Sequence, residues 1–203
     1  LMREDCSLET LVEEMQDMGK RYPRAGYGGM FRHWLVEENP KPYNSFGNGS
    51  AMRVAPCAWV SDQLEEVESL AEASAIVTHN HPEGIKGAKA TAAAIWMARN
   101  HYEKDEIKEY ITKKYGYNLD RTIQEIKDSG YRFDSTCQGS VPEAIIAFLE
   151  GDDFDEVIRL AIYLGGDADT QAAIAGSIAE AFYDIPNKNV EIAKKHLDPY
   201  LIN

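Results

Sequence analysis

The sequence has few of the features that mark secreted, membrane or zinc-stabilised proteins. Its 203 residues include three cysteines, Cys6, Cys57 and Cys137, and no Cys-x-x-Cys pair, which excludes a disulfide framework and a cysteine-based zinc site. No apolar run approaches the roughly 18 residues that a membrane span needs, and the first residues show no basic-then-apolar signal pattern. We therefore expect a cytoplasmic protein that does not associate with membranes.

Positive charge is also scarce. The 34 acidic residues outnumber the 21 basic ones, and the formal net charge at pH 7 is -13. A surplus of negative charge opposes binding to nucleic acids and to anionic lipid surfaces. We expect no nucleic-acid partner, whereas an arginine-bearing protein partner is electrostatically acceptable.

The chain also lacks the period-two alternation of a half-buried strand, so no sheet is expected. Apolar residues recur instead at helical spacing, which predicts an all-α protein with a single domain over residues 1–203. The segment 23–56, rich in proline and glycine, is expected to be irregular and functional, because long loops in compact domains are seldom idle. The expected helices cover residues 8–18 after a Ser7 cap, 64–77 after Ser61, 87–98, 105–114, 121–127, 141–150 with Ser140 as the N-cap, 153–164, the segment after Thr170, and 190–196.

Two carboxylates and a hydroxyl stand where one of these helices begins, in the run GGDADT at residues 165–170. Asp167, Asp169 and Thr170 offer the oxygen ligands that hard divalent cations prefer. For an isolated Asp-x-Asp the commoner explanation is a turn and an N-cap. The glycine pair before it and the densely apolar helix after it favour a functional site here.

A glycine-rich run, SFGNGSAM at residues 45–52, precedes another predicted helix. Asn-Gly is a common turn pair, so a plain turn is one interpretation. The alternative is an anion site, because successive glycines let backbone N–H groups approach a phosphate and a following helix N-terminus adds a favourable dipole. The residues alone leave both interpretations open.

His79 and His81 form a His-x-His pair of the kind found in zinc sites. No further ligand stands at a recognisable spacing, so we expect no metal there and interpret His81 as a polar loop residue. A neutral imidazole at position 79 would suit a hydrogen bond to a phosphate or a ribose.

Four motifs together resemble the ADP-ribosylglycohydrolase family, and their order and spacing match it from about residue 22 to residue 181. They are RAGYGG at 24–29, NSFGNGSAMRV at 44–54, VTHNHPEG at 77–84, and LGGDADTQAAIAG at 164–176. The resemblance implies the family's all-α orthogonal helical bundle. It also implies hydrolysis of the glycosidic bond that joins ADP-ribose to a modified protein or to a small acceptor.

The resemblance further implies roles for individual residues. Phe46 would form the aromatic face for adenine, and His79 would contact the bound nucleotide. The full set of implied substrate-binding residues is Asn44, Ser45, Phe46, Gly47, Asn48, Gly49, Ser50, Met52 and His79. The implied ligands for Mg²⁺, of which the family's complete site holds two ions, are Asp167, Asp169 and Thr170.

The chain departs from the family pattern at its start. Family members carry an earlier Thr-Asp-Asp-Thr cluster and an acidic residue upstream of it, and neither is present here. We therefore expect an N-terminally incomplete domain with at most a partial Mg²⁺ site, and we assign no catalytic residue. A helix missing there would bare apolar surface, which a homodimer would cover. Two alternatives follow, namely an ADP-ribosylglycohydrolase, or a non-catalytic ADP-ribose-binding module or inactive fragment.

Overall fold

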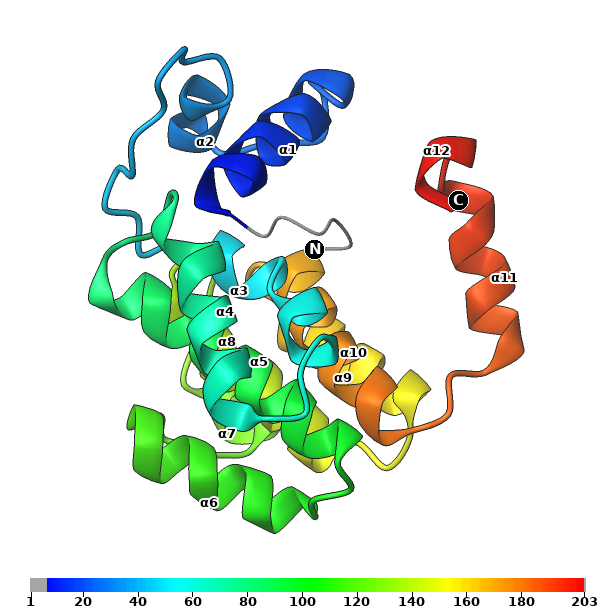
Figure 1. Cartoon of the computed structure of the whole chain (residues 1–203). Helices are drawn as coiled ribbons and strands as arrows, with labels where there is room; N and C mark the ends of the chain where they lie inside the picture. The colour runs from blue at the N-terminus through cyan, green and yellow to red at the C-terminus, as the bar shows by residue number, and fades with distance from the viewer. Residues whose placement is uncertain (1–6, 203) are drawn as a thin grey trace.

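The computed structural model describes residues 7–202, and within that range the chain forms helices and no sheet, as the sequence predicts. Extended backbone pairs there only in an isolated antiparallel bridge between Gly47 and Thr136. Figure 1 shows the helices in chain order. They are α1 (Leu8–Arg21), α2 (Gly29–Trp34), α3 (Gly49–Met52), the 3₁₀ helix η1 (Ala55–Trp59), α4 (Leu64–Ile76), α5 (Pro82–Arg99), α6 (Lys104–Tyr115), α7 (Ile123–Asp128), α8 (Cys137–Glu150), α9 (Phe154–Leu164), α10 (Ala168–Phe182), α11 (Asn187–His196) and α12 (Pro199–Ile202).

The alanine-rich helix α5 is the centre of the bundle, and it packs against α3, α4, α6, α8, α10 and η1. Small side chains let these neighbours approach closely without cost to helix propensity. The closest approach is at Gly87, where an added Cβ would lie 2.4 Å from the sulfur of Cys137 on α8. The fully or almost fully buried alanines of α5 are Ala88, Ala90, Ala92, Ala93, Ala94 and Ala98. The expected central position is confirmed, although α5 begins at Pro82 instead of Gly87, since a proline fits the first helical turn.

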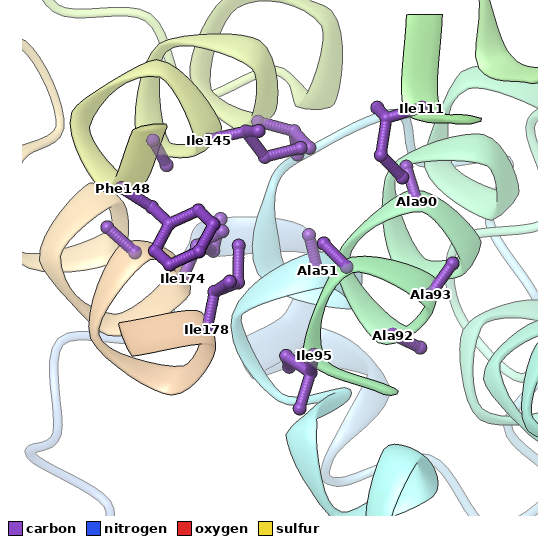
Figure 2. Packing of buried hydrophobic residues seen from close by; sticks show 14 of the residues in the cluster. Ala51, Ala90, Ala92, Ala93, Ile95, Ile111, Ile145, Phe148, Ile174 and Ile178 are labelled. Atoms are coloured by element: carbon purple, nitrogen blue, oxygen red, sulfur yellow. The ribbon is translucent and has the colours of Figure 1, made fainter. Parts of the chain in front are cut away.

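Larger apolar side chains of α8 and α10 fill the space on one side of α5 (Figure 2). Ile145 and Phe148 from α8 face Ile174 and Ile178 from α10, and all four are buried. The segment after Thr170 is therefore a core helix, as its dense apolar composition predicts. This packing fixes the N-terminus of α10, where the Asp-x-Asp motif lies, against the bundle.

The amphipathic helix α1 is confirmed together with its N-cap, because the Ser7 hydroxyl accepts from the backbone N–H of Thr10 at 3.2 Å. Its apolar face covers a small second cluster around Trp34 and Leu35. Gly19 lets α1 approach Leu35, since a Cβ there would lie 2.4 Å from that side chain.

The helix α4 begins at Leu64, as predicted, and its N-cap is Gln63. Other boundary predictions are wrong. The expected irregular segment 23–56 contains α2 and α3, which span 6 and 4 residues and are too short to show a helical period. The helix α8 begins at Cys137, and its N-cap is Thr136, whose side chain accepts from the N–H of Gly139 at 3.1 Å, so Ser140 is no cap.

The last two helices, α11 and α12, stand at one side of the bundle (Figure 1). They are joined to α1 by the Tyr22 hydroxyl, which donates to Asp198 at 2.6 Å, and by Arg21, which lies over the ring of Tyr200. No helix in the described part of the chain is both long and apolar enough to cross a membrane.

Candidate functional site

The glycine-rich loop and the Asp-x-Asp motif, 119 residues apart in sequence, meet in space through Asn48. The side-chain amide of Asn48 donates to Oδ2 of Asp167 at 2.7 Å. Asn48 is 7% exposed and Asp167 is half-buried, so the contact is sheltered from bulk water. The structure thus brings together two of the motifs singled out in the sequence.

The glycine-rich loop is pinned to the start of α8. The N–H of Asn48 donates to the carbonyl of Ser135 at 2.8 Å, and the N–H of Cys137 donates to the carbonyl of Phe46 at 2.9 Å. Within the loop, the N–H of Gly47 donates to the hydroxyl of Ser45 at 3.1 Å. The N–H groups of Gly47 and Asn48 are therefore already hydrogen-bonded within the protein.

Two apolar side chains of this loop stand open to solvent. Phe46 is 45% exposed, and its ring centroid lies 5.3 Å from that of His81. Met52 is 46% exposed, and its sulfur accepts a weak hydrogen bond from the Thr170 hydroxyl at 3.6 Å. The apolar surface of Met52 therefore lies beside Thr170, and the aromatic surface of Phe46 lies beside His81.

Asn44, at the start of the loop, has a positive φ of 54°, a conformation that asparagine tolerates better than most residues. Its N–H donates to Oδ1 of Asn80 at 2.8 Å. This bond ties the loop to the His-x-His segment, so the second and third motifs of the sequence also meet.

His79 is buried beside the glycines of the loop. An added Cβ on Gly47 or Gly49 would lie 3.5 or 3.4 Å from its Nε2. Burial, together with the charge of Arg53, lowers the pKa of His79 to about 3, so the imidazole is neutral at physiological pH. Its other nitrogen, Nδ1, lies 2.7 Å from the hydroxyl of Thr78, to which Arg53 donates at 2.8 Å.

His81 has a structural role of its own. It is the N-cap of α5, and its Nδ1 accepts from the N–H of Glu83 at 3.1 Å. One nitrogen of each histidine is thus hydrogen-bonded within the protein. His81, which the sequence analysis interprets as a polar loop residue, is therefore the N-cap of a helix.

The Asp-x-Asp motif occupies the turn from α9 into α10. Gly165 and Gly166 have φ values of 83° and 76°, which favour glycine, and they reverse the chain between the two helices. Asp167 stands at the N-cap position of α10, yet its carboxylate makes no capping bond. The simple cap interpretation of Asp167 therefore does not describe this structure.

The three oxygen-bearing side chains of the motif lie at different depths. Asp169 is exposed, Asp167 is half-buried and Thr170 is 6% exposed. Burial raises the pKa of Asp167, and the neighbouring Asp169 carboxylate raises it further, whereas the hydrogen bond from Asn48 acts in the opposite direction. Two acidic groups held this close are an arrangement that a cation would stabilise.

The donor set fits a hard divalent cation only in part. Within residues 7–202 no group of three or more His, Cys, Asp or Glu side chains could hold a metal ion. Asp167 and Asp169 offer two carboxylates and Thr170 a hydroxyl, which are oxygen donors that suit Mg²⁺, an ion that usually binds through one or two carboxylates and keeps several of its waters.

Further residues support the site that the sequence analysis did not single out. The Tyr131 hydroxyl donates to the carbonyl of Gly139 at 2.6 Å and accepts from Nε2 of Gln171 at 2.7 Å. The Tyr131 ring packs on the backbone of Gly166, where a Cβ would approach it to 2.6 Å. Gln171 has no exposed surface. Its position could have been noticed in the sequence, because it is a lone amide in an otherwise apolar helix. Nothing in the sequence distinguishes Tyr131 from other loop tyrosines.

The comparisons with known proteins agree with these motifs. The family model described as ADP-ribosylglycohydrolase matches residues 5–194. A solved structure titled as an ADP-ribosylglycohydrolase-related protein complex superposes with a TM-score of 0.67 at 26% sequence identity, covering 91% of this chain and 71% of that one.

Two curated relatives carry related names. The chain is 30% identical to the ADP-ribosylarginine hydrolase Tri1 of Pseudomonas putida, covering 73% of this chain and 42% of that protein. It is 31% identical to the ADP-ribosylhydrolase ARH3 of Homo sapiens, covering 81% of this chain and 61% of that protein. The chain therefore spans about half the length of the curated relatives it matches.

Proposed function

Because the chain belongs to the ADP-ribosylglycohydrolase family, we propose that it supplies the nucleotide-binding loop and a metal-ligating loop of a magnesium-dependent hydrolase that releases ADP-ribose from a modified protein or small acceptor. The observation that carries this proposal is the 2.7 Å contact between Asn48 and Asp167. An enzyme of this class must hold the nucleotide and the reacting ribose at once. A nucleotide bound along the glycine-rich loop would extend directly beside the two carboxylates.

The nucleotide would be held by groups of three kinds. The exposed ring of Phe46 offers an apolar face for adenine. Gly49, the half-buried first residue of α3, would offer its backbone N–H to the diphosphate. His79 adds a neutral imidazole, whose Nδ1 is bonded to the Thr78 hydroxyl and whose Nε2 lies beside Gly47 and Gly49, where it can form a hydrogen bond with the nucleotide.

The Asp-x-Asp loop would hold Mg²⁺ through Asp167, Asp169 and Thr170. When bound, Mg²⁺ would supply Lewis-acid polarisation and orientation of water and ribose hydroxyls. The chain's own contribution is to keep Asp167 in position through Asn48 and to bring Thr170 against Met52 at the edge of the nucleotide loop. Holding the reacting groups in a fixed geometry in this way lowers the entropic part of the barrier.

In the reaction, the bond between the anomeric carbon of the ribose and the acceptor nitrogen or oxygen breaks. Water adds its oxygen to that carbon, and a proton from the water goes to the acceptor. The relative from Pseudomonas putida is named for ADP-ribosylarginine, and the net charge of -13 is compatible with an arginine-bearing substrate protein. We assign no general acid or base among the described residues.

A non-catalytic ADP-ribose-binding module is the second candidate. It is favoured by the partial donor set, since residues 7–202 contain no group of three or more His, Cys, Asp or Glu that could hold a metal. Binding of a nucleotide by the glycine-rich loop would not require a metal-binding cluster.

Release of ADP-ribose from an ADP-ribosylated protein separates the two candidates. The hydrolase proposal predicts release that requires Mg²⁺ and is abolished in Asp167→Asn, which removes one anionic ligand while preserving the size of the side chain. The matched control is Asp120→Asn, an exposed surface aspartate on another part of the bundle. Tight ADP-ribose binding without any release would contradict the hydrolase and support the binding module.

A further inference from the structure

Ser140, one turn into α8, is completely buried and makes two hydrogen bonds. Its hydroxyl lies 2.7 Å from the carbonyl of Asp134, and a carbonyl oxygen can only accept, so Ser140 donates its one hydrogen there. The lone pairs of Ser140 are thereby turned towards the side chain of Asn48, whose Nδ2 lies at 2.9 Å. The backbone of the loop before α8 thus fixes the direction in which Ser140 accepts.

The amide of Asn48 is oriented by this acceptor. Its Nδ2 carries two hydrogens, of which one goes to Ser140 and the other to Oδ2 of Asp167. If the amide rotated by half a turn, its carbonyl oxygen would face the Asp167 carboxylate, and two acceptors would oppose each other. Asn48 is 7% exposed, so water cannot freely replace either bond, and leaving a buried N–H without an acceptor is costly.

We propose that Ser140 is a positioning residue for the metal-ligating loop, acting on Asp167 through Asn48. The inference rests on the proposed function, because it concerns the carboxylate that would hold Mg²⁺. Asn48 occupies Oδ2 of Asp167 and holds the carboxylate in one orientation. Outer-shell groups of this kind hold a carboxylate ligand in the geometry that a metal needs.

The same bonds link the two loops energetically. Asn48 belongs to the nucleotide loop, Asp167 belongs to the metal-ligating loop, and Ser140 holds the amide between them. A cation that orders Asp167 would also order Asn48, and a nucleotide that orders the loop would favour the cation in return, since binding couplings are reciprocal.

The test is a titration of the whole chain with Mg²⁺, followed by the NMR signals of the Asn48 side-chain amide. We expect both Nδ2 hydrogens of the wild-type protein to shift with Mg²⁺. In Ser140→Ala, Mg²⁺ affinity should fall about tenfold, the lower end of the loss seen when outer-shell partners are removed. Ser140→Thr keeps the hydroxyl and should restore most of the affinity.

The control is Thr91→Val, which removes a buried hydroxyl of α5 that has no hydrogen-bond partner among the described residues and should leave Mg²⁺ binding unchanged. Wild-type Mg²⁺ affinity in Ser140→Ala, or an equal loss in Ser140→Thr, would overturn the positioning role and leave the proposed function intact. Absence of any Mg²⁺ response in the wild-type chain would instead refute the metal-dependent function, and the inference with it.

Discussion

At the scale of single residues, the site depends on buried polar side chains whose hydrogen bonds fix their chemical state. His79 is the clearest case, because its burial and the charge of Arg53 both disfavour the imidazolium. A neutral ring with Nδ1 bonded to Thr78 turns Nε2 towards the glycine-rich loop, whereas desolvation would destabilise a charged ring in the same buried position.

The depressed pKa of His79 predicts a pH dependence of stability. In the unfolded chain the residue takes up a proton near pH 6.5, whereas in the folded protein it does so only near pH 3. The stabilisation is therefore complete above about pH 6.5 and is lost as the pH falls towards 3, with a slope of at most about 1.4 kcal/mol per pH unit. Urea unfolding between pH 7 and pH 4 should show a shallower decline for His79→Gln than for the wild-type protein.

His33→Gln is the matched control, because the His33 side chain is 79% exposed and its ion-pair partner, Glu37, lies on the surface with it. It should follow the wild-type curve. Identical pH profiles for His79→Gln and the wild-type protein would show that His79 titrates normally in the folded state.

At the scale of elements, the long helices and their faces were predictable, and the short elements were not. The periods of α1, α9 and α10 were visible because each helix has 11 to 15 residues. The short helices α2 and α3 contain too few residues for a period, so their segment looked irregular. The N-cap of α8 was misplaced for a different reason: threonine and serine both suit the N-cap position, so the residue types at 136 and 140 do not distinguish the two.

The same limit applies to the site. The acids at 167 and 169, the glycine-rich loop and the buried histidine could be found as motifs, because each has an unusual local composition. Their contacts could not be found, since Asn48 and Asp167 are 119 residues apart and only the packing of α8 and α10 on α5 brings them together. Ser140 was noticed for its position before an apolar helix, but its bond to Asn48 depends on the tertiary fold.

The cap assignment for α8 leads to a direct prediction. Thr136→Ala removes the side-chain acceptor for the N–H of Gly139 and should lower the free energy of unfolding by about 1 kcal/mol. Thr122→Ala, which removes the corresponding cap of α7, is the comparison, and its loss should be of similar size because the Thr122 hydroxyl accepts from Glu125 in the same way. If the free energy of unfolding of Thr136→Ala equals that of the wild-type protein, the Thr136 side chain does not stabilise α8 as its N-cap.

The turn from α9 into α10 yields a second prediction about an element. Gly166→Ala forces an L-residue into a φ of 76° and brings a Cβ to 2.6 Å from the Tyr131 ring. The conformational cost alone is roughly 1–2 kcal/mol, and the collision adds to it. Gly26→Ala is the matched control, with a φ of 78° and no atom near its Cβ.

Denaturant unfolding of the two glycine variants isolates the contribution of Tyr131. Gly166→Ala should lose clearly more stability than Gly26→Ala, and the excess should shrink when Tyr131 is also changed to Leu. Equal losses in the two glycine variants would mean that the ring does not support this turn.

At the scale of the whole molecule, the bundle works as a frame that holds two loops against each other. The alanine-rich α5 keeps α8 and α10 close, α8 carries Ser140 next to the glycine-rich loop, and α10 carries the acids at its N-terminus. The chain lies within the ADP-ribosylglycohydrolase family by its sequence and by its fold. Since it spans about half the length of the curated relatives it matches, the central claim concerns the site that these residues form, namely an ADP-ribose site on the loop at 44–52.

Calorimetric titration with ADP-ribose tests that claim most directly. The wild-type chain should bind, and Phe46→Ala should weaken binding by about 1–3 kcal/mol, the usual value of stacking between a base and an aromatic ring. The control is Tyr102→Ala, an aromatic residue of similar exposure (38% against 45%) that follows the opposite end of α5, and it should bind as the wild-type protein does. No binding by the wild-type chain, or equal affinity in Phe46→Ala and the wild-type protein, would contradict the account.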